Sequence, residues 1–592
     1  MKRHVWLALS MMGVACAEPL PPHHWKLMQW LPTGPPELRR RVAKWEGITL
    51  DTPLPSMRVQ QDDVSLVTRS ASPAMAWASF PLPKGTWSVS FEARIDKPNG
   101  RMSVNFGQEV DVFALAPGWQ RFSLVSNFPY RSDKAGLYVR AVTPGTTELR
   151  SWQVERVPDP APVQGAEPVA ELRLVHPSYR HTLYAFDSDR TVRVAVPDAT
   201  PVSLSDAGGH VLQISPLRSR VSEPEDAVAF DVSSLSPGTY HLTAGKADLV
   251  VSVAPPVADV VDIREGLMRR NGVPWFPLGI YPQGAAVDLA PPGVDTACIN
   301  LDAQPVSGAA ASIVFRMVRG EAGLSDFLHD LLAQGAGHRI LAWSCLDEPD
   351  LTAKGALLEP SYRMLRDLDP FHPAYTAVHS SAAIPAFMGG TDIMATDPYP
   401  IATTEPPIWL VATAMDRARA VAGPDRSIWL VNQAFGLYPF WQRAPSPAEE
   451  RCMAWLAINH GARGIIYYAQ VENLWPHSPD LKFHLEKSPL YGAITELNAG
   501  IRLVEPVLLS NEPAPPATLL DDDGSLDVKT WSLRGETYVS VVNVTGAAVT
   551  ARVQVSGTVA TDVLSGRDWP VSGGMFSADL PPLGARFFRL TR

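Results

Sequence analysis

Cysteine is scarce in this chain, with four among 592 residues. Apart from Cys16 near the N-terminus, the chain carries Cys298, Cys345 and Cys452. All three lie in apolar segments and their number is odd, which predicts buried free thiols rather than a disulfide framework. No spacing among Cys, His and acidic residues indicates a structural zinc site, and we expect no metal or organic cofactor.

Basic runs are also lacking, and the formal net charge is −10. This balance argues against nucleic acid or an acidic membrane surface as a partner. Beyond the N-terminus, no segment is apolar over the length that a bilayer span requires, so we expect no transmembrane segment. The sequence indicates no particular oligomeric state.

The N-terminus has the pattern of an export signal. Lys2-Arg3-His4 is a basic start, residues 5–14 are apolar but too short to span a bilayer, and Ala15-Cys16-Ala17 offers a cleavage site. We therefore expect residues 1–17 to be removed and the protein to be periplasmic or extracellular. The alternative is a lipoprotein anchored through Cys16, for which Gly13 is a poor match.

Proline, glycine and tryptophan are plentiful, at 56, 41 and 17 residues. The length predicts roughly three to five domains. Period-two alternation over residues 40–157 predicts a β-sandwich, as in the segments 86–94, 119–124 and 136–141. Its order of strands resembles the jelly-roll carbohydrate-binding modules of glycosidases. Trp77, Trp119 and Trp152 are candidates for sugar stacking, with the sandwich core as the other possibility.

Two further β domains are predicted. Residues 169–255 follow a linker rich in proline and alanine, and their Ser-Pro-Gly-Thr-Tyr turn is typical of immunoglobulin-like sandwiches. Residues 515–592 show the strand pattern of another small sandwich.

Between these domains, residues 258–508 alternate apolar strands with helical periodicity, which predicts repeating βα units. Eight strands in about 250 residues is the size of a TIM barrel. Helices are expected over 324–334, 362–368 and 448–460, the last one begun by Ser446 and Pro447. The strands are expected within residues 267–281, 294–301, 312–317, 340–343, 374–378, 392–399, 427–434 and 461–468.

Side chains at the carboxyl ends of all eight barrel strands converge on one mouth. These ends are polar, acidic and aromatic, without a phosphate-binding glycine loop, a nucleophilic serine elbow or a lysine. Such groups suit a hydroxyl-rich neutral ligand, although each could instead cap a helix or build a turn. The residues at these ends are Tyr281, Asn300, Asp347, Glu348, His379, Asp397, Tyr399, Gln433, Tyr467, Tyr468, Gln470 and Glu472.

The stretch Leu346-Asp-Glu-Pro349 closes the fourth predicted strand. It resembles the Asn-Glu-Pro motif of the glycoside hydrolase clan that includes β-galactosidases and endoglucanases, with Asp347 in the Asn place. The segment Asn-Gly-x-Pro-x-Phe-x-x-Gly at residues 271–279, which leads into the first barrel strand, also resembles that clan. So does the order of sandwich, barrel and sandwich along the chain. The resemblance implies that Glu348 is the catalytic acid/base.

The chain departs from this clan at strand seven, where the clan carries its nucleophilic Glu. Here the strand ends Val431-Asn-Gln-Ala434. The second carboxylate is then Asp397, which we favour, or Glu472, or the barrel binds sugar without cleaving it. A pair of carboxylates can act on one glycosidic bond only if they lie within roughly 10 Å of each other.

The predicted function is therefore that of an exported glycoside hydrolase acting on an oligo- or polysaccharide, with a non-catalytic carbohydrate-binding protein as the alternative. The residues expected to contact the sugar are Asp347, Tyr281, Tyr399, Gln433, Tyr468, Glu472 and Trp475.

Overall fold

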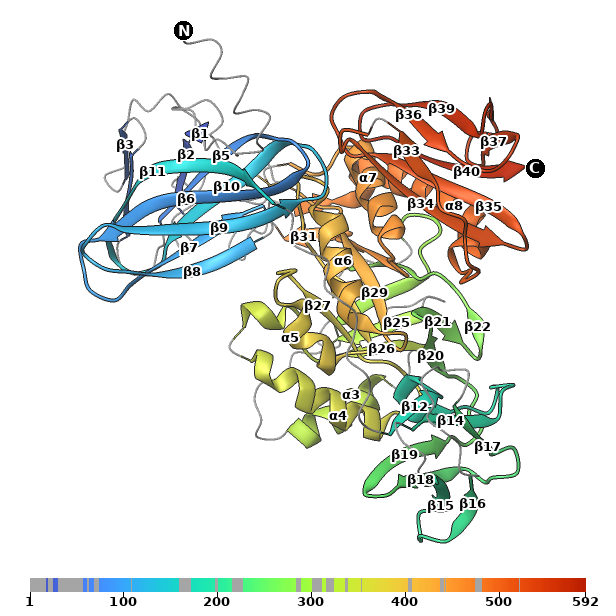
Figure 1. Cartoon of the computed structure of the whole chain (residues 1–592). Helices are drawn as coiled ribbons and strands as arrows, with labels where there is room; N and C mark the ends of the chain where they lie inside the picture. The colour runs from blue at the N-terminus through green and yellow to red at the C-terminus, as the bar shows by residue number, and fades with distance from the viewer. Residues whose placement is uncertain are drawn as a thin grey trace.

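The computed structural model describes residues 18–19, 25–29, 57–60, 63–68, 74–107, 109–158, 172–196, 201–215, 227–283, 289–300, 311–315, 324–335, 339–352, 354–402, 407–436, 441, 443–473, 482–520 and 522–591. A central barrel is flanked by antiparallel β domains (Figure 1). The predicted multidomain architecture, a TIM barrel with β-sandwiches on its N- and C-terminal sides, is confirmed.

Eight parallel strands form the barrel in the order β26-β25-β24-β23-β30-β29-β28-β27. A parallel bridge between Trp343 and Ala374 joins the two end strands and nearly closes the ring. The strands are apolar and buried on both faces, as expected for a parallel sheet that is covered by helices. They are β23 (Leu278–Ile280), β24 (Thr296–Asn300), β25 (Ala311–Phe315), β26 (Ile340–Ser344), β27 (Tyr375–Val378), β28 (Ile393–Thr396), β29 (Ser427–Gln433) and β30 (Ile465–Tyr468).

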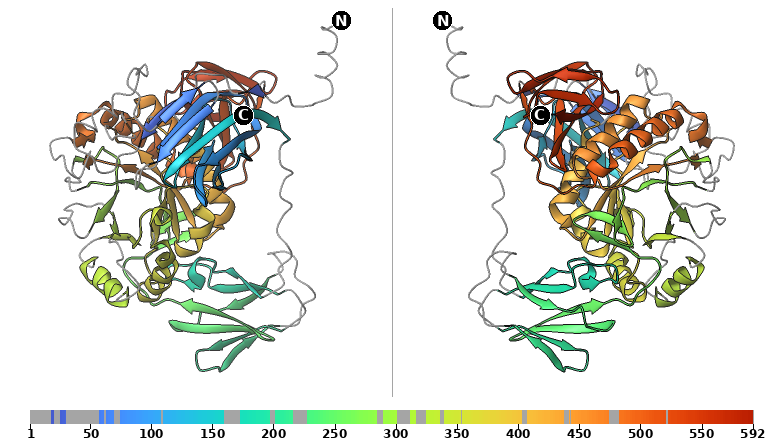
Figure 2. Two further views of the ribbon diagram at one scale, coloured as in Figure 1. Left: turned by 90° about the vertical axis from the view of Figure 1, so that its left-hand side faces the viewer. Right: turned by 90° about the vertical axis from the view of Figure 1, so that its right-hand side faces the viewer.

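Helices cover the outside of the barrel (Figure 2). The predicted helix that follows Ser446 is present, and its capping box is complete, because Ser446 accepts from the Glu449 amide while the Glu449 carboxylate accepts from the Ser446 amide. The other two predicted helices are also present. The helices are α3 (Leu324–Gly335), α4 (Leu358–Leu368), α5 (Ile384–Phe387), α6 (Leu410–Ala422), α7 (Pro447–Asn459) and α8 (Pro489–Leu508).

Two antiparallel sheets form the N-terminal sandwich, in the orders β3-β4-β11-β6-β9 and β2-β5-β10-β7-β8, with β1 on the edge of the first. Trp152 is core, stacked on Phe91 with 4.4 Å between ring centroids. Trp119 is half-buried, and the guanidinium groups of Arg94 and Arg150 lie 4.7 and 3.9 Å from its ring centroid. The strands are β1 (Glu18–Pro19), β2 (Trp25–Gln29), β3 (Met57–Gln60), β4 (Asp63–Thr68), β5 (Ala74–Leu82), β6 (Gly85–Ile95), β7 (Gly100–Phe106), β8 (Glu109–Leu115), β9 (Gln120–Phe128), β10 (Ser132–Ala141) and β11 (Gly145–Val157).

The second β domain has sheets β12-β14-β17 and β13-β19-β18-β15-β16, and the small sheet β20-β21-β22 leads from it into the barrel. These strands are β12 (Arg173–His176), β13 (Thr182–Leu183), β14 (Thr191–Ala195), β15 (Ser203–Asp206), β16 (Val211–Ile214), β17 (Val228–Asp231), β18 (Gly238–Ala244), β19 (Ala247–Val253), β20 (Val261–Arg264), β21 (Leu267–Arg270) and β22 (Val273–Pro274).

The C-terminal domain has sheets β33-β36-β39 and β34-β35-β40-β37-β38. Between the barrel's last strand and α8 lies the hairpin of β31 (Val471–Asn473) and β32 (Lys482–His484). The C-terminal strands are β33 (Thr518–Leu520), β34 (Leu526–Leu533), β35 (Glu536–Asn543), β36 (Val549–Gln554), β37 (Val559–Asp562), β38 (Asp568–Pro570), β39 (Met575–Leu580) and β40 (Ala585–Thr591).

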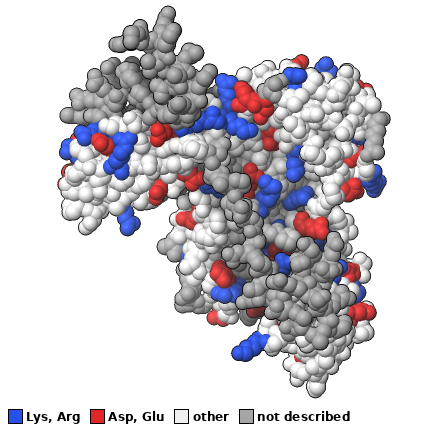
Figure 3. Space-filling model, viewed as in Figure 1, with Lys and Arg blue, Asp and Glu red and all other residues white. Residues whose placement is uncertain are grey.

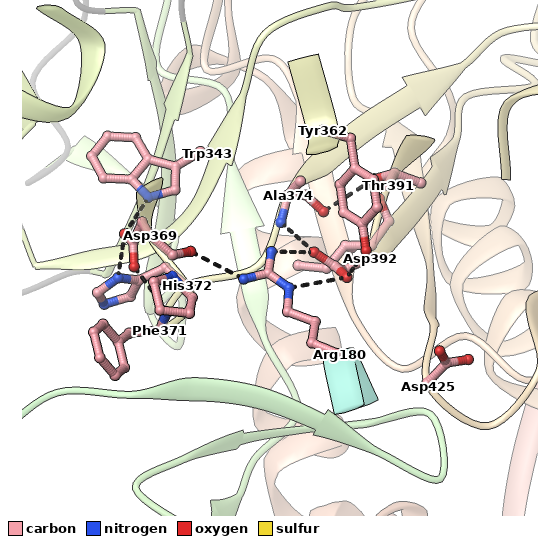
Figure 4. Close-up of polar contacts among 12 residues, drawn as sticks. Arg180, Trp343, Tyr362, Asp369, Phe371, His372, Ala374, Thr391, Asp392 and Asp425 are labelled. Atoms are coloured by element: carbon pink, nitrogen blue, oxygen red, sulfur yellow. Dashed lines mark hydrogen bonds and ion pairs between the residues drawn. The ribbon is translucent and has the colours of Figure 1, made fainter. Parts of the chain in front are cut away.

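A buried ion pair fixes the second domain to the barrel (Figure 4). Arg180 Nη2 lies 2.6 Å from Asp392 Oδ2, and its Nη1 donates to the Asp369 carbonyl at 3.1 Å. Asp392 directly precedes β28, so this contact lies at the amino ends of the barrel strands. The second domain therefore covers the end of the barrel opposite to the predicted active site.

A second polar junction joins three domains. His460, which follows α7, contacts Asp416 of α6 at 2.9 Å and Asp527 of β34 at 3.2 Å. The Tyr130 hydroxyl of the N-terminal sandwich donates to the same Asp527 at 2.8 Å, and Asn459 donates to its other oxygen at 2.6 Å. Both terminal β domains are thereby bonded to the helices at one side of the barrel.

The three cysteines Cys298, Cys345 and Cys452 are buried free thiols, as predicted. Over the described part of the chain, no helix combines the length and apolarity that a membrane crossing needs. On the face drawn in Figure 3, Lys and Arg side chains are interspersed with Asp and Glu.

Candidate active site

The turn after β26 presents Glu348 at the carboxyl end of the barrel. Glu348 adopts left-handed backbone angles, with φ 43° and ψ 57°, which a residue with a side chain adopts only when its surroundings hold it there. Two bonds to the next strand do so: the Glu348 amide donates to the Ala377 carbonyl at 3.0 Å, and the Thr376 hydroxyl donates to the Leu346 carbonyl at 2.7 Å.

The carboxylate of Asp350 fixes the neighbouring turn. It accepts backbone hydrogen bonds from His379 at 3.2 Å and from Ser380 at 2.7 Å. These residues follow β27 directly, so Asp350 fixes the position of the backbone from which the His379 side chain extends. The ends of β26 and β27 are thus connected on both sides of Glu348.

Glu348, His379 and Asp397 come together from three successive barrel strands, β26, β27 and β28. Glu348 Oε1 lies 3.7 Å from His379 Nδ1. One carboxylate oxygen of each acid and one ring nitrogen of His379 all lie within 4.8 Å of one another. The structure therefore places Asp397 well inside the distance that a two-carboxylate reaction requires.

Asp397 and Asp347 differ from Glu348 in their surroundings. Asp397 is only 4% exposed and its Oδ1 has no hydrogen-bond partner. Burial, followed by the charges of Glu348 and Asp347, raises the pKa of Asp397 well above its usual range. Burial and the charges of Glu348 and Asp350 raise the pKa of Asp347 to about 7.

Aromatic rings line one side of this cluster. The ring of Tyr399 lies 6.0 Å from that of Tyr468, and Phe435 lies edge-on to both at 5.1 and 5.5 Å. Trp441 extends the group, and its indole N–H donates to the Tyr399 carbonyl at 3.2 Å. The rings offer apolar faces and edges next to the carboxylates.

Tyr281 lies deeper than the other predicted tyrosines. Its hydroxyl is 3.0 Å from that of Tyr375 inside the barrel, and its ring meets Tyr468 edge-on at 5.2 Å. Its side chain is buried, whereas its neighbour Tyr468 is half-buried and its hydroxyl accepts from Gln283 at 3.3 Å.

Gln433 ends β29, and both ends of its amide group bond to the backbone of Ile401. Its Oε1 accepts from the Ile401 amide at 2.9 Å and its Nε2 donates to the Ile401 carbonyl at 3.0 Å. The residue before it, Asn432, donates to the buried carboxylate of Glu450 on α7 at 2.7 Å. The end of β29 is thus hydrogen-bonded both to the loop after β28 and to α7.

The remaining predicted positions lie near the end of strand eight. Glu472 lies in β31, paired with Phe483, and its side chain is outside the described residues. Trp475 also lies outside them.

The residues of this site that the sequence did not indicate are Phe435 and Trp441. His379 was expected at the barrel mouth because it directly follows a strand, but no role in the site was assigned to it. Phe435 and Trp441 are aromatic residues after strand seven, and only the folded chain brings them against Tyr399.

No protein-family model matches the chain, and a search of curated proteins finds no match. Among solved structures, a β-glucuronidase of Parabacteroides merdae aligns at 10% identity over 98% of this chain and 96% of its own, with a TM-score of 0.28. A β-glucuronidase of an uncultured Clostridium species aligns at 10% identity over 76% and 92%, with a TM-score of 0.27. An Anoxybacillus α-amylase aligns at 11% identity over 48% and 76%, with a TM-score of 0.35. The barrel itself is identified by its strand order.

Proposed function

We propose that this protein is a glycoside hydrolase that cleaves O-glycosidic bonds of an oligo- or polysaccharide. The observation that carries the proposal is the approach of the Glu348 and Asp397 carboxylates to within 4.8 Å at the carboxyl end of the barrel. Two carboxyl groups on either side of one bond are what glycoside hydrolysis needs. The half-buried rings of Tyr399 and Tyr468, backed by the buried ring of Phe435, supply a surface on which a sugar can pack.

The reaction follows from this pair. Glu348, one-third exposed, donates a proton to the glycosidic oxygen as the bond to the anomeric carbon breaks. The Asp397 carboxylate forms a covalent ester with that carbon, and a water deprotonated by Glu348 then hydrolyses the ester. A separation of roughly 5–5.5 Å accompanies retention and roughly 6.5–9.5 Å inversion, so the close approach of the pair favours retention.

The burial of Asp397 favours the opposite assignment of roles within the same pair. Burial raises the pKa of Asp397, and an acid with a raised pKa holds the proton that the leaving group needs. Glu348 would then be the nucleophile. Azide distinguishes the two assignments, because a variant without its nucleophile and a variant without its acid yield glycosyl azides of opposite anomeric configuration.

The test is a panel of aryl glycosides and polysaccharides given to the wild type, Glu348→Gln and Asp397→Asn. Each variant is expected to lose about 10²- to 10⁴-fold in kcat on a substrate with a poor leaving group. The control is Glu359→Gln, which changes an exposed carboxylate on α4. Equal rates for the wild type and Glu348→Gln would refute the assignment of Glu348.

A non-catalytic carbohydrate-binding protein is the second candidate. The observation that favours it is that strand seven ends in Gln433, whose amide is bonded only within the protein. Under that function, the wild type would bind an oligosaccharide without releasing product, and Glu348→Gln would bind it with the same affinity.

A further inference from the structure

We propose that Glu348, His379 and Asp397 form a binding site for one divalent transition-metal ion, with Zn²⁺ as its representative. We further infer that the ion competes with the proton that the hydrolytic reaction uses. The second part rests on the proposed glycoside hydrolase function, and the first part does not.

The donor atoms are already gathered. In a tetrahedral site with bonds of about 2.0–2.2 Å, two ligand atoms lie about 3.4 Å apart. Glu348 Oε1 and His379 Nδ1 are 3.7 Å apart, and one carboxylate oxygen of each acid and one ring nitrogen of His379 lie within 4.8 Å of one another. A small adjustment of side chains would bring all three into coordination distance.

Two polar atoms of these side chains are buried and have no hydrogen-bond partner among the described residues. They are Asp397 Oδ1, on a side chain that is 4% exposed, and His379 Nδ1. A buried carboxylate oxygen without a donor is unfavourable, and either a proton or a cation satisfies it. A cation held by the three side chains would satisfy both atoms at once, which a single proton on Asp397 would not.

The surrounding charge supports the same conclusion. The charges that act most strongly on Asp397 are those of the carboxylates Glu348, Asp347 and Asp350. Among the salt bridges of the described residues, none joins Asp347 or Asp397 to a lysine or arginine. A divalent cation would neutralise this concentration of negative charge.

The donor set selects the class of ion. One imidazole nitrogen with two carboxylate oxygens suits Zn²⁺, Mn²⁺ or Co²⁺, whereas Mg²⁺ and Ca²⁺ prefer oxygen alone. The Glu348 and His379 side chains are 34% and 37% exposed, so a fourth position is open to water or a substrate hydroxyl. A bound ion would occupy the lone pairs through which Glu348 exchanges its proton.

The backbone keeps these donors in place. Asp350 holds the His379 amide, and the Ala377 carbonyl holds the Glu348 amide. The positions from which two of the three ligands extend are therefore set before any ion arrives.

The test is titration of Zn²⁺ into the tag-free, EDTA-treated full chain, followed by calorimetry, with Co²⁺ absorption as a second readout of coordination. One equivalent is expected to bind, and neither Mg²⁺ nor Ca²⁺ should displace it. Glu348→Gln, His379→Gln and Asp397→Asn should each lower the Zn²⁺ affinity at least about tenfold, because loss even of an indirect partner costs that much.

The matched control is His241→Gln. His241 has similar exposure and one carboxylate partner, Asp248 at 3.1 Å, but belongs to the second β domain. Its replacement should leave Zn²⁺ affinity unchanged. Failure of the wild type to bind Zn²⁺ saturably, or an affinity that is the same in all three site variants, would overturn the proposal.

Activity tests the second part separately. On any glycoside that the wild type cleaves, Zn²⁺ should inhibit at the concentration at which it binds, and EDTA should restore the rate. Zn²⁺ binding without any glycosidase activity would refute the proposed function and leave the metal site standing. Glycosidase activity without Zn²⁺ binding would refute the metal site and leave the proposed function standing.

Discussion

Arg180 and Asp392 form a buried ion pair across a domain boundary, with 2.6 Å between Nη2 and Oδ2 and side-chain exposures of 2% and 0%. Asp392 also accepts from the Tyr362 hydroxyl at 2.8 Å and from the Ala374 amide at 2.8 Å (Figure 4). Every oxygen of this carboxylate is therefore engaged. The pair lies at the amino end of the barrel, and the candidate site lies at the opposite, carboxyl end.

Removal of Arg180 should destabilise the protein without altering the candidate site. Arg180→Ala leaves the Asp392 charge buried without its partner, which costs about 3–5 kcal/mol. The loss should appear as a lower Tm and an earlier transition in urea, with KM unchanged. The control is Arg363→Ala, whose partner Glu359 is as exposed as Arg363 itself, and which should cost less than about 1 kcal/mol. A loss for Arg180→Ala as small as that of the control would contradict the prediction.

His460 should make stability depend on pH above neutrality. Burial lowers the pKa of His460, but hydrogen bonds to Asp416 and Asp527 outweigh it and raise that pKa to about 9 from an ordinary 6.5. A raised folded-state pKa gives stabilisation that is complete below 6.5 and is lost as pH rises through 9, at most about 3 kcal/mol. Tm should therefore fall between pH 6.5 and 9.

The two acids at this junction act in the opposite pH range. The pKa values of Asp416 and Asp527 are lowered by hydrogen bonds to His460, which outweigh burial. The stabilisation that these two carboxylates give is present above pH 3.8, their ordinary pKa, and is lost as the pH falls through their lowered pKa values in the folded protein. His460→Gln should remove the decline in Tm above pH 6.5, whereas His241→Gln should keep it. A decline that persists unchanged in His460→Gln would place its cause elsewhere.

The barrel was predictable because its strands are short apolar runs with clear ends, such as Ile340–Ser344 followed by two acids and Pro349. The helix α7 was predictable from Ser446 and Pro447. In contrast, α6 begins after Trp409 without a capping side chain, so no start signal marks it in the sequence. Long apolar segments of the chain with weak boundaries need tertiary packing to determine their structure.

The candidate site was predictable only to the level of strand ends. The carboxyl ends of all strands of a barrel meet at one mouth. The sequence therefore predicted that Glu348 and Asp397 lie close together, because both follow parallel strands of the barrel. It could not show that the Gln433 amide bonds to Ile401, since Ile401 lies 32 residues away in a loop. Contacts of that kind depend on how loops fold over the mouth, which strand periodicity does not specify.

Asp347 should influence the pH dependence of activity. The pKa of Asp347 is about 7, so its carboxylate is ionised mainly above that pH and then raises the pKa of Asp397. Asp347→Asn removes this neighbouring charge and should lower the pKa of Asp397. If Asp397 is the nucleophile, the acid limb of the kcat/KM profile should therefore move to lower pH, and if Asp397 is the acid, the alkaline limb should do so. Both limbs at the same pH in the two proteins would show that Asp347 does not act on the reacting pair.

Tyr468 should contribute binding through its ring rather than its hydroxyl. Its ring contacts those of Tyr281, Tyr399 and Phe435, whereas its hydroxyl accepts from Gln283 at the mouth. If a sugar packs on this ring, the contact is worth about 0.5–1.5 kcal/mol, and Tyr468→Ala should raise KM about 2- to 12-fold. Tyr468→Phe retains the ring and should leave KM within about twofold of the wild type. Steady-state kinetics on one glycoside at fixed pH measures both variants, and an equal rise in KM for the two would assign the contact to the hydroxyl.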